Sequence, residues 1–299
     1  MRTAAPRVSR PPAPEPAGFA PLDWALLGGA AGVWGASFLL IAIGVDHFEP
    51  GLVAFLRTAF GAATLAAFPG ARRAIAREDR VKVAILGIVW MAVPFVLFSV
   101  AEQWIDSSLA GMLNAATPLF TAVVAAGVAR SLPASRQAAG LVLGFCGVVA
   151  VTAPSVNGAD ADLLGAGLVL LAALLYGFAF NLTGPLQSRN GALPVIFRAQ
   201  LVALVLLLPV GATGVPGSHF AWEAIAAVAV LGCFGTALAY VWASTLAGRV
   251  GGTRSSVITY FVPAVAIALG ALARDETIPA LAVVGTAMIV AGAYVTSRG

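Results

Sequence analysis

Residues 84–100 read AILGIVWMAVPFVLFSV, and residues 229–245 repeat the pattern as AVLGCFGTALAYVWAST. One shift of 145 residues, without a gap, pairs Leu86 with Leu231, Gly87 with Gly232, Phe95 with Tyr240, Ser99 with Ser244, Pro118 with Pro263, Gly140 with Gly285 and Gly147 with Gly292. A register held over about 60 residues is hard to attribute to an Ala/Gly/Val-rich composition alone. The chain is therefore predicted to contain two copies of one structural unit.

Composition places both copies in a membrane. Of the 299 residues, 60% are apolar and only 10% are charged, and the mean hydropathy is +0.94. Ordinary soluble domains carry roughly 25% charged residues, so this chain cannot cover a water-facing surface. Several uncharged runs reach the roughly 20 residues with which a helix crosses ~30 Å of hydrocarbon. We therefore expect an all-α integral membrane protein with little structure outside the bilayer.

Proline, glycine and charge clusters divide the chain into ten predicted transmembrane helices. These helices lie at about 22–44, 50–68, 83–103, 107–128, 137–153, 163–181, 193–211, 221–243, 252–272 and 278–296. The connections between them are short, so no soluble domain is expected. Residues 1–21 are predicted to form a disordered cytoplasmic tail, because they are rich in proline and lack the apolar run of a cleavable signal peptide.

The distribution of Lys and Arg gives an orientation, because cytoplasmic loops are enriched in them. Fourteen of these residues lie in the tail, at the C-terminus or in the even-numbered gaps between spans, and only Arg274 lies in an odd-numbered gap. Both termini are thus predicted to be cytoplasmic in a multi-pass protein of a bacterial-type inner membrane. The formal charge of +4 follows from this topology and gives no reason to expect nucleic-acid binding.

Five spans per copy is an odd number, so the second copy must cross the membrane in the opposite sense to the first. The predicted architecture is two inverted five-helix repeats, residues 22–153 and 163–296. Secondary transporters use this arrangement and place the substrate near the midplane, between the halves. One pattern in two opposite orientations supplies inward-open and outward-open states of similar energy, which is what alternating access requires.

Short motifs follow one another in the same order in both halves. The first half carries WGASF, AFLR, NAATPLF and FCGVV, and the second carries YGFAF, IFR, TYFVPAV and GTAMIVAG. In this combination the chain resembles the drug/metabolite transporter superfamily with two EamA-type halves, over nearly its whole length. The resemblance implies a ten-helix secondary carrier similar to exporters of amino acids and related metabolites, including YddG-like aromatic amino-acid exporters. One departure is that the connection before the last helix of the first half, ARSLPASR, has no glutamate, whereas the matched connection of the second half, ARDETIPA, offers Glu276.

Pro118 and Pro263 lie near the middle of the fourth and ninth spans and are predicted to be hinges. A proline inside a helix frees the carbonyl four residues earlier, here that of Asn114 and that of Thr259. Such irregular backbone is tolerated in a membrane only where it packs in protein or lines a wet cavity. One interpretation gives these spans a place in a central cavity, and the other makes the prolines packing kinks. The candidate substrate contacts in these spans are Asn114, Thr117, Thr259 and Tyr260.

Aromatic and hydroxyl side chains recur on four further spans. The candidate contacts are Phe95 and Ser99 in the third span, Tyr240 and Ser244 in the eighth, Trp34 and Ser37 in the first, and Tyr176 and Phe180 in the sixth. Residues three or four apart share one side of a helix, and ligand pockets are mostly apolar with a few placed polar groups. Helix packing is the alternative for each pair. If the site is correct, replacing Asn114 or Tyr240 by alanine impairs transport with little loss of expression.

Two arginines lie within predicted spans at matched places in the repeat, Arg57 in AFLR and Arg198 in IFR. A cation inside the bilayer costs roughly 2.5–3.5 kcal/mol on insertion scales, so it is expected to face the protein interior or a cavity. Each arginine is about two helical turns from a span end, so its side chain can also extend to the interface. The sequence leaves both interpretations open: an interfacial arginine, or a charge that joins the halves or guides an anionic group during gating.

The acidic residues all fall in the tail, in loops or close to span ends, and both histidines lie in loops. A central proton relay is therefore not expected, although Glu102 near a span end keeps proton coupling open. The spans hold no cluster of nucleophiles, metal ligands or paired carboxylates, so we expect neither an enzyme nor a bound metal or cofactor.

The predicted function is a secondary transporter that exports small neutral or aromatic amino acids, or related metabolites, by alternating access. Aromatic walls, hydroxyls, an amide and exposed carbonyls suit such a solute. The alternative is a multidrug efflux carrier for cationic or hydrophobic drugs. The expected partners are a small-molecule substrate and the lipid bilayer, and the sequence does not decide the oligomeric state.

Overall fold

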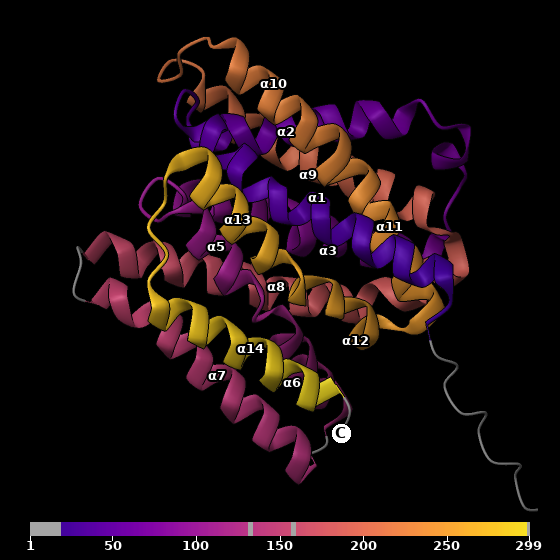
Figure 1. The fold of residues 1–299 in the computed structure, drawn as a ribbon. Coiled ribbons are helices and arrows are strands. Elements are labelled where there is room, and N and C mark those ends of the chain that lie inside the picture. The colour runs from indigo at the N-terminus through magenta and orange to yellow at the C-terminus, as the bar shows by residue number, and fades with distance from the viewer. Residues whose placement is uncertain (1–18, 131–133, 157–159, 298–299) are drawn as a thin grey trace, which may run out of the picture.

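The computed structural model describes residues 19–130, 134–156 and 160–297, so the predicted tail lies almost wholly outside the described residues. Helices make up nearly all of the described chain, and these ranges contain no β-strand. Figure 1 shows them as one bundle, with α7 and α14 side by side along one edge. The all-helical class predicted from the composition is therefore confirmed.

The elements follow one another with short connections. They are α1 Pro21–Val45, α2 Pro50–Ala66, η1 Pro69–Arg72, η2 Arg77–Asp79, α3 Arg80–Gly87, η3 Ile88–Ala92, α4 Val93–Ala101, α5 Ser107–Asn114, α6 Thr117–Ala129, α7 Ser135–Val156, α8 Asp160–Asn190, α9 Ala192–Gly214, α10 Trp222–Val230, η4 Leu231–Leu238, α11 Ala239–Val250, α12 Gly252–Ser255, η5 Ser256–Tyr260, α13 Val262–Arg274 and α14 Ala280–Ser297. By length and composition, eight stretches can each cross a membrane, and Pro50–Ala66 and Ala280–Thr296 are shorter apolar helices.

The predicted span 163–181 is too short, because α8 continues to Asn190 through Pro185. Polar side chains beyond residue 181 bond back to the helix instead of ending it. Ser188 donates to the carbonyl of Gly184 at 2.9 Å, and Asn190 donates to that of Leu186 at 3.1 Å.

Several local features recur at the 145-residue shift. The wide helical turn η3 lies in the first half, and η4 lies at the matched place in the second. The helices α6 and α13 match residue for residue in their bounds. Each ends at a residue with left-handed backbone, Arg130 with φ 49° and Asp275 with φ 54°. Since side chains other than glycine rarely adopt this conformation, its recurrence in both halves supports one shared unit.

Glycines let α7 and α14 approach each other backbone to backbone. A Cβ atom added at Gly147 would lie 2.6 Å from the carbonyl oxygen of Gly285, and one added at Gly285 would lie 2.7 Å from that of Gly147. Gly140 makes a similar approach to Gly292, since a Cβ atom added there would lie 2.7 Å from the carbonyl oxygen of Gly292. In contrast, an added Cβ at Gly28 or Gly32 of α1 meets nothing within 4 Å, so these two glycines do not mark a close helix contact.

Glu276, in the connection between α13 and α14, caps the start of α5. Its Oε1 accepts hydrogen bonds from the backbone N–H of Ser107 at 3.1 Å and from the Ser107 hydroxyl at 2.6 Å, and Oε2 accepts one from the Ser108 N–H at 2.9 Å. Partial burial opposes the charged form, but the hydrogen bonds from Ser107 and Ser108 outweigh it and lower the pKa of Glu276. Glu276, which has no acidic counterpart at the matched position of the first half, therefore ties the second half to the first.

Replacement of Glu276 by glutamine is expected to lower the stability of the detergent-purified protein by about 1–2 kcal/mol, because it removes an anionic cap from a helix start. Since the pKa of Glu276 is depressed in the folded protein, this stabilisation is present above the ordinary carboxyl range and is lost as the pH falls. The melting temperatures of wild type and Glu276→Gln should converge in acid. The matched control is Glu223→Gln, which removes an exposed acid that contacts His47 at 3.3 Å. Equal effects of both substitutions would contradict the cap.

Candidate functional site

Two helices break at prolines near the centre of the bundle. The helix α5 ends at Asn114, and α6 begins at Thr117 with Pro118 in its first turn. In the second half, η5 ends before α13, whose first turn contains Pro263. The carbonyl of Asn114 accepts a hydrogen bond from the Thr117 hydroxyl at 2.8 Å, so this freed group is satisfied inside the protein. Both predicted hinges are thus breaks at which a new helix starts.

A small cavity lies against these breaks, between the two halves. It is lined by Trp34, Ser37, Phe38, Ile41, Arg57, Phe98 and Asn114 from the first half and by Tyr176, Tyr240 and Thr259 from the second. Its volume is about 30 Å³, which leaves room for about one or two water molecules. The cavity is therefore closed to any larger solute in this conformation.

Aromatic rings pack around Tyr240, which lines the cavity together with Trp34, while Trp90 and Phe95 lie behind it. The ring centroid of Tyr240 lies 4.8 Å from that of Trp90, 5.2 Å from that of Trp34 and 5.9 Å from that of Phe95. Its hydroxyl lies 3.1 Å from the hydroxyl of Tyr176 and donates to the carbonyl of Trp90, also at 3.1 Å. Tyr240 is 1% exposed, so it joins the halves as well as facing the cavity.

The wide turns η3 and η4 supply the carbonyls that these side chains use. Trp90 in η3 and Gly235 in η4 are matched positions of the repeat, and each directs its carbonyl to a cavity-wall side chain. The carbonyl of Gly235 accepts a hydrogen bond from Trp34 Nε1 at 3.1 Å, as that of Trp90 does from Tyr240. Wide turns inside α-helices are frequent at functional sites, and here both copies place one beside the cavity.

Arg57 reaches the cavity from α2. It is 3% exposed, so it does not extend to an interface. Its Nε donates to the Thr236 hydroxyl at 3.1 Å, which links the two halves, and its Cζ lies 3.8 Å from the centroid of the Phe95 ring. Cations are attracted to aromatic faces in this geometry. Of the two interpretations left open for Arg57, the interior position is the one observed.

Arg198, its counterpart in the repeat, lies elsewhere. Nη1 donates to the carbonyl of Ala71 at 3.1 Å, and Nη2 donates to that of Arg72 at 3.3 Å. Arg198 therefore holds the connection after α2 and does not line the central cavity. The two arginines match in sequence but not in role.

The remaining predicted contacts surround the cavity or lie deeper in the core. Phe180 packs against Trp90 at 5.5 Å between centroids, and Thr117 bonds to Asn114. Tyr260 packs beside a buried apolar cluster with members from both halves, and Ser99 and Ser244 are fully buried. Neither these five side chains nor that of Phe95, which packs against Tyr240 and Arg57, lines the cavity.

Sequence reasoning missed three lining residues, Phe38, Ile41 and Phe98. They belong to helices that are apolar on every side, so no contrast between polar and apolar faces marks the side that looks inward. The rings of Phe38 and Phe98 pack at 5.5 Å, and Phe98 also approaches Tyr176 at 5.7 Å. The run of aromatics in the third span was a usable signal, but it did not identify which ring faces the cavity.

The acids near this site do not pair with Arg57. Glu102, one helical turn beyond Phe98, is 8% exposed, and neither carboxyl oxygen has a hydrogen-bond partner in the described chain. In addition, the described residues contain no group of three or more His, Cys, Asp or Glu side chains that could hold a metal ion.

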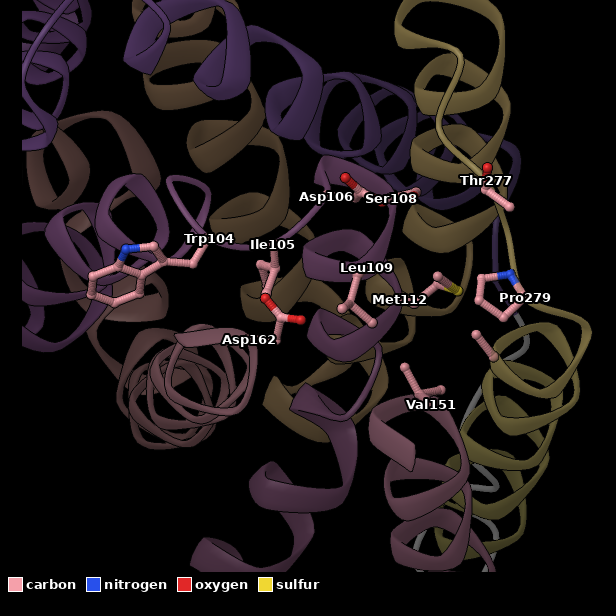
Figure 2. Close-up of a pocket in the computed structure, with 11 residues that line it drawn as sticks. Trp104, Ile105, Asp106, Ser108, Leu109, Met112, Val151, Asp162, Thr277 and Pro279 are labelled. Atoms are coloured by element: carbon pink, nitrogen blue, oxygen red, sulfur yellow. The ribbon is translucent and has the colours of Figure 1, made fainter. Parts of the chain in front are cut away.

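A larger cavity, of about 330 Å³, lies at one end of the bundle (Figure 2). Asp106, Ser108, Asp162 and Thr277 give it a polar lining, and Trp104 and Met112 are among its apolar residues. It shares no lining residue with the central cavity. Its size alone does not make it the transport site, because it opens at the end of the bundle and not between the matched helix breaks.

Comparison with known proteins places this geometry in a family. The model of the EamA-like transporter family matches residues 23–153 and again residues 163–298. A crystal structure covers 92% of this chain and 96% of its own with a TM-score of 0.63 at 17% identity, a similarity that concerns the fold alone.

Curated relatives extend over nearly the same length. A probable terminal-alkyne amino-acid exporter of Streptantibioticus cattleyicolor is 31% identical, over 89% of this chain and 90% of the relative. A probable amino-acid metabolite efflux pump of Salmonella typhimurium is 27% identical, over 89% and 92%. An uncharacterized transporter of Archaeoglobus fulgidus is 23% identical, over 92% and 98%. The resemblance to the drug/metabolite transporter superfamily is confirmed, and the chain belongs to the EamA-like transporter family.

Proposed function

We propose that this chain is a secondary carrier that exports small neutral or aromatic amino acids, or closely related metabolites, across a bacterial-type inner membrane. Its architecture is ten transmembrane helices in two inverted five-helix repeats, residues 22–153 and 163–296, with both termini in the cytoplasm. The matched wide turns, helix breaks and left-handed residues support the repeat. The concentration of Lys and Arg in the even-numbered gaps supports the orientation.

One observation carries the transport mechanism: an aromatic cavity between the halves that is too small for any solute beyond water. Ligand pockets for small molecules usually have volumes of ~300–1,000 Å³. The halves must therefore separate on one side to admit a solute and on the other side to release it, which is alternating access. The residues proposed to contact the solute as they separate are Trp34, Ser37, Asn114, Tyr176, Tyr240 and Thr259.

The cavity chemistry favours amino acids over cationic drugs. The buried charge in its lining is a cation, Arg57, and the described lining contains no carboxylate or histidine. A cationic drug would meet a like charge there, whereas a zwitterion presents a carboxylate. Two relatives described as probable exporters of amino acids or their metabolites support the same substrate class. The absence of an acid from the described lining also supports transport without a central proton relay.

Counterflow into proteoliposomes tests this function. Purified protein is reconstituted in vesicles loaded with unlabelled amino acid, and entry of labelled phenylalanine, leucine or alanine is followed. We expect phenylalanine to accumulate above the level of protein-free vesicles, because the cavity walls are aromatic. If a cationic dye moves and no amino acid does, the multidrug alternative is correct and the amino-acid assignment is wrong.

Replacing Asn114 by alanine is expected to reduce phenylalanine counterflow by about tenfold, since a buried polar contact to a solute is worth about 1–1.5 kcal/mol. Asn114 is 3% exposed and lines the cavity at the end of α5, and its truncation leaves the aromatic wall in place. The amount of folded protein, measured by size-exclusion chromatography, should stay near wild type. Full counterflow by folded Asn114→Ala protein would remove Asn114 from the site.

A further inference from the structure

Arg57 is a buried cation whose described contacts are all neutral. Its Nε bonds to a hydroxyl, that of Thr236, and its guanidinium carbon lies over the ring of Phe95. Within residues 19–130, 134–156 and 160–297, it makes no ion pair, and its two Nη groups make no hydrogen bond. An arginine has five N–H donors, so four of them remain for another partner.

The acids of the structure are engaged elsewhere or are out of contact. Glu276 is bonded to Ser107 and Ser108, and Asp46 is paired with Arg274 at 2.6 Å. Glu102 is the buried acid closest in sequence to the cavity, but its oxygens accept no hydrogen bond in the described chain, so it is not bonded to Arg57. A buried charge is stable when it is paired and hydrogen-bonded. Because the described protein offers Arg57 no anionic partner, the partner of this guanidinium is expected to come from outside the protein.

We propose that Arg57 binds the carboxylate of the exported amino acid. This assignment rests on the proposed function and names the group of the solute that the cavity recognises. Because Thr236 holds Nε and Phe95 supports the guanidinium plane, the remaining edge with both Nη groups is oriented in advance. A guanidinium edge matches a carboxylate with two parallel hydrogen bonds.

The surroundings of Arg57 explain how one cavity binds both the carboxylate and the side chain of the amino acid. Trp34, Tyr176 and Tyr240 line the same cavity and present apolar ring surface for a side chain. The contact between Arg57 and Thr236 also spans the two halves, so a carboxylate bound at the guanidinium is positioned where the halves meet. Binding of the solute and movement of the halves are thereby coupled through one residue.

The test compares solutes that differ only at the carboxylate. Phenylalanine, phenylalaninamide and phenethylamine compete with labelled phenylalanine for counterflow by the full-length protein in proteoliposomes. The wild type should prefer phenylalanine over the amide by roughly 10- to 100-fold, the range expected for charge-assisted hydrogen bonds. In Arg57→Gln this preference should disappear, because the amide and the acid then meet the same neutral group. Arg198→Gln, the matched arginine outside the cavity, should keep the wild-type preference.

Further readouts separate the possible failures. Thermal stabilisation of the purified protein by phenylalanine, but not by the amide, should be present in the wild type and absent in Arg57→Gln. If Arg57→Gln does not fold, Arg57→Lys is used, and it should weaken phenylalanine competition while leaving amide competition unchanged. A folded Arg57→Gln protein that keeps the preference for phenylalanine over the amide overturns the assignment. Arg57→Lys overturns it too if competition by phenylalanine and competition by the amide weaken equally. Failure of the proposed function is different: the wild type itself then moves no amino acid.

Discussion

Gly147→Leu is expected to remove most of the folded protein from the membrane, while Gly28→Leu leaves its amount near wild type. An added Cβ at Gly147 would lie 2.6 Å from a backbone oxygen of α14 and 2.7 Å from the backbone nitrogen of Ile289, and backbone cannot turn aside as a flexible side chain can. Overpacking of this kind costs about 1–3 kcal/mol and sometimes more. We expect the cost at Gly147 to lie at the upper end, because the added atoms meet backbone that cannot move aside. The free energy of unfolding of a whole protein is only about 5–15 kcal/mol, so such a cost is a large fraction of it.

The measurement is the yield and melting temperature of detergent-purified, monodisperse protein. Gly285→Leu should reproduce the effect from the other helix, because the close approach is reciprocal. Gly28 is the matched control, since it lies in a membrane helix of the same chain and an added Cβ there meets nothing within 4 Å. If Gly147→Leu accumulates and melts as Gly28→Leu does, then α7 and α14 do not pack backbone to backbone.

The elements that could be predicted from sequence are those marked by a chemical signal. Apolar runs marked the helices, and Pro118 and Pro263 marked the two breaks, because proline cannot continue the hydrogen-bond ladder of a helix. The duplication in the sequence also predicted that the two halves share matched structural features. By contrast, no residue type marks a wide turn, so η3 and η4 could not be foreseen, although their carbonyls hold the aromatic wall.

The candidate site was predictable in its location but not in its detail. Seven predicted residues meet at the cavity, since the prolines and the aromatic stripes mark the right helices. The rotation of each helix was not predictable, because a helix that is apolar all round gives no signal for the side that faces inward. The two arginines show the same limit. Their matched places in the repeat follow from sequence, but Arg57 turns to Thr236 whereas Arg198 turns to backbone carbonyls at a helix end.

Tyr240→Phe is expected to fold and to lose most of its transport, whereas Tyr240→Ala is expected to fold poorly. Truncation to alanine at a fully buried aromatic position costs about 3–5 kcal/mol, because the neighbouring rings cannot fill the space. The burial of Tyr240 among Trp34, Trp90 and Phe95 therefore replaces the sequence-based expectation that alanine leaves expression unchanged.

Phenylalanine at position 240 keeps the ring contacts and deletes only the hydroxyl that bonds to Trp90 and Tyr176. The carbonyl of Trp90 then loses a partner inside the core, which costs about 1–3 kcal/mol and falls on a contact between the two halves. If closure of the halves depends on this contact, counterflow per folded protein should fall by roughly fivefold or more. Tyr176→Phe is the matched control, because it removes the hydroxyl pair but leaves the bond from Tyr240 to Trp90 intact, and it should reduce counterflow less. Wild-type flux in folded Tyr240→Phe would show that the hydroxyl only fills space, and the aromatic wall alone would then close the cavity.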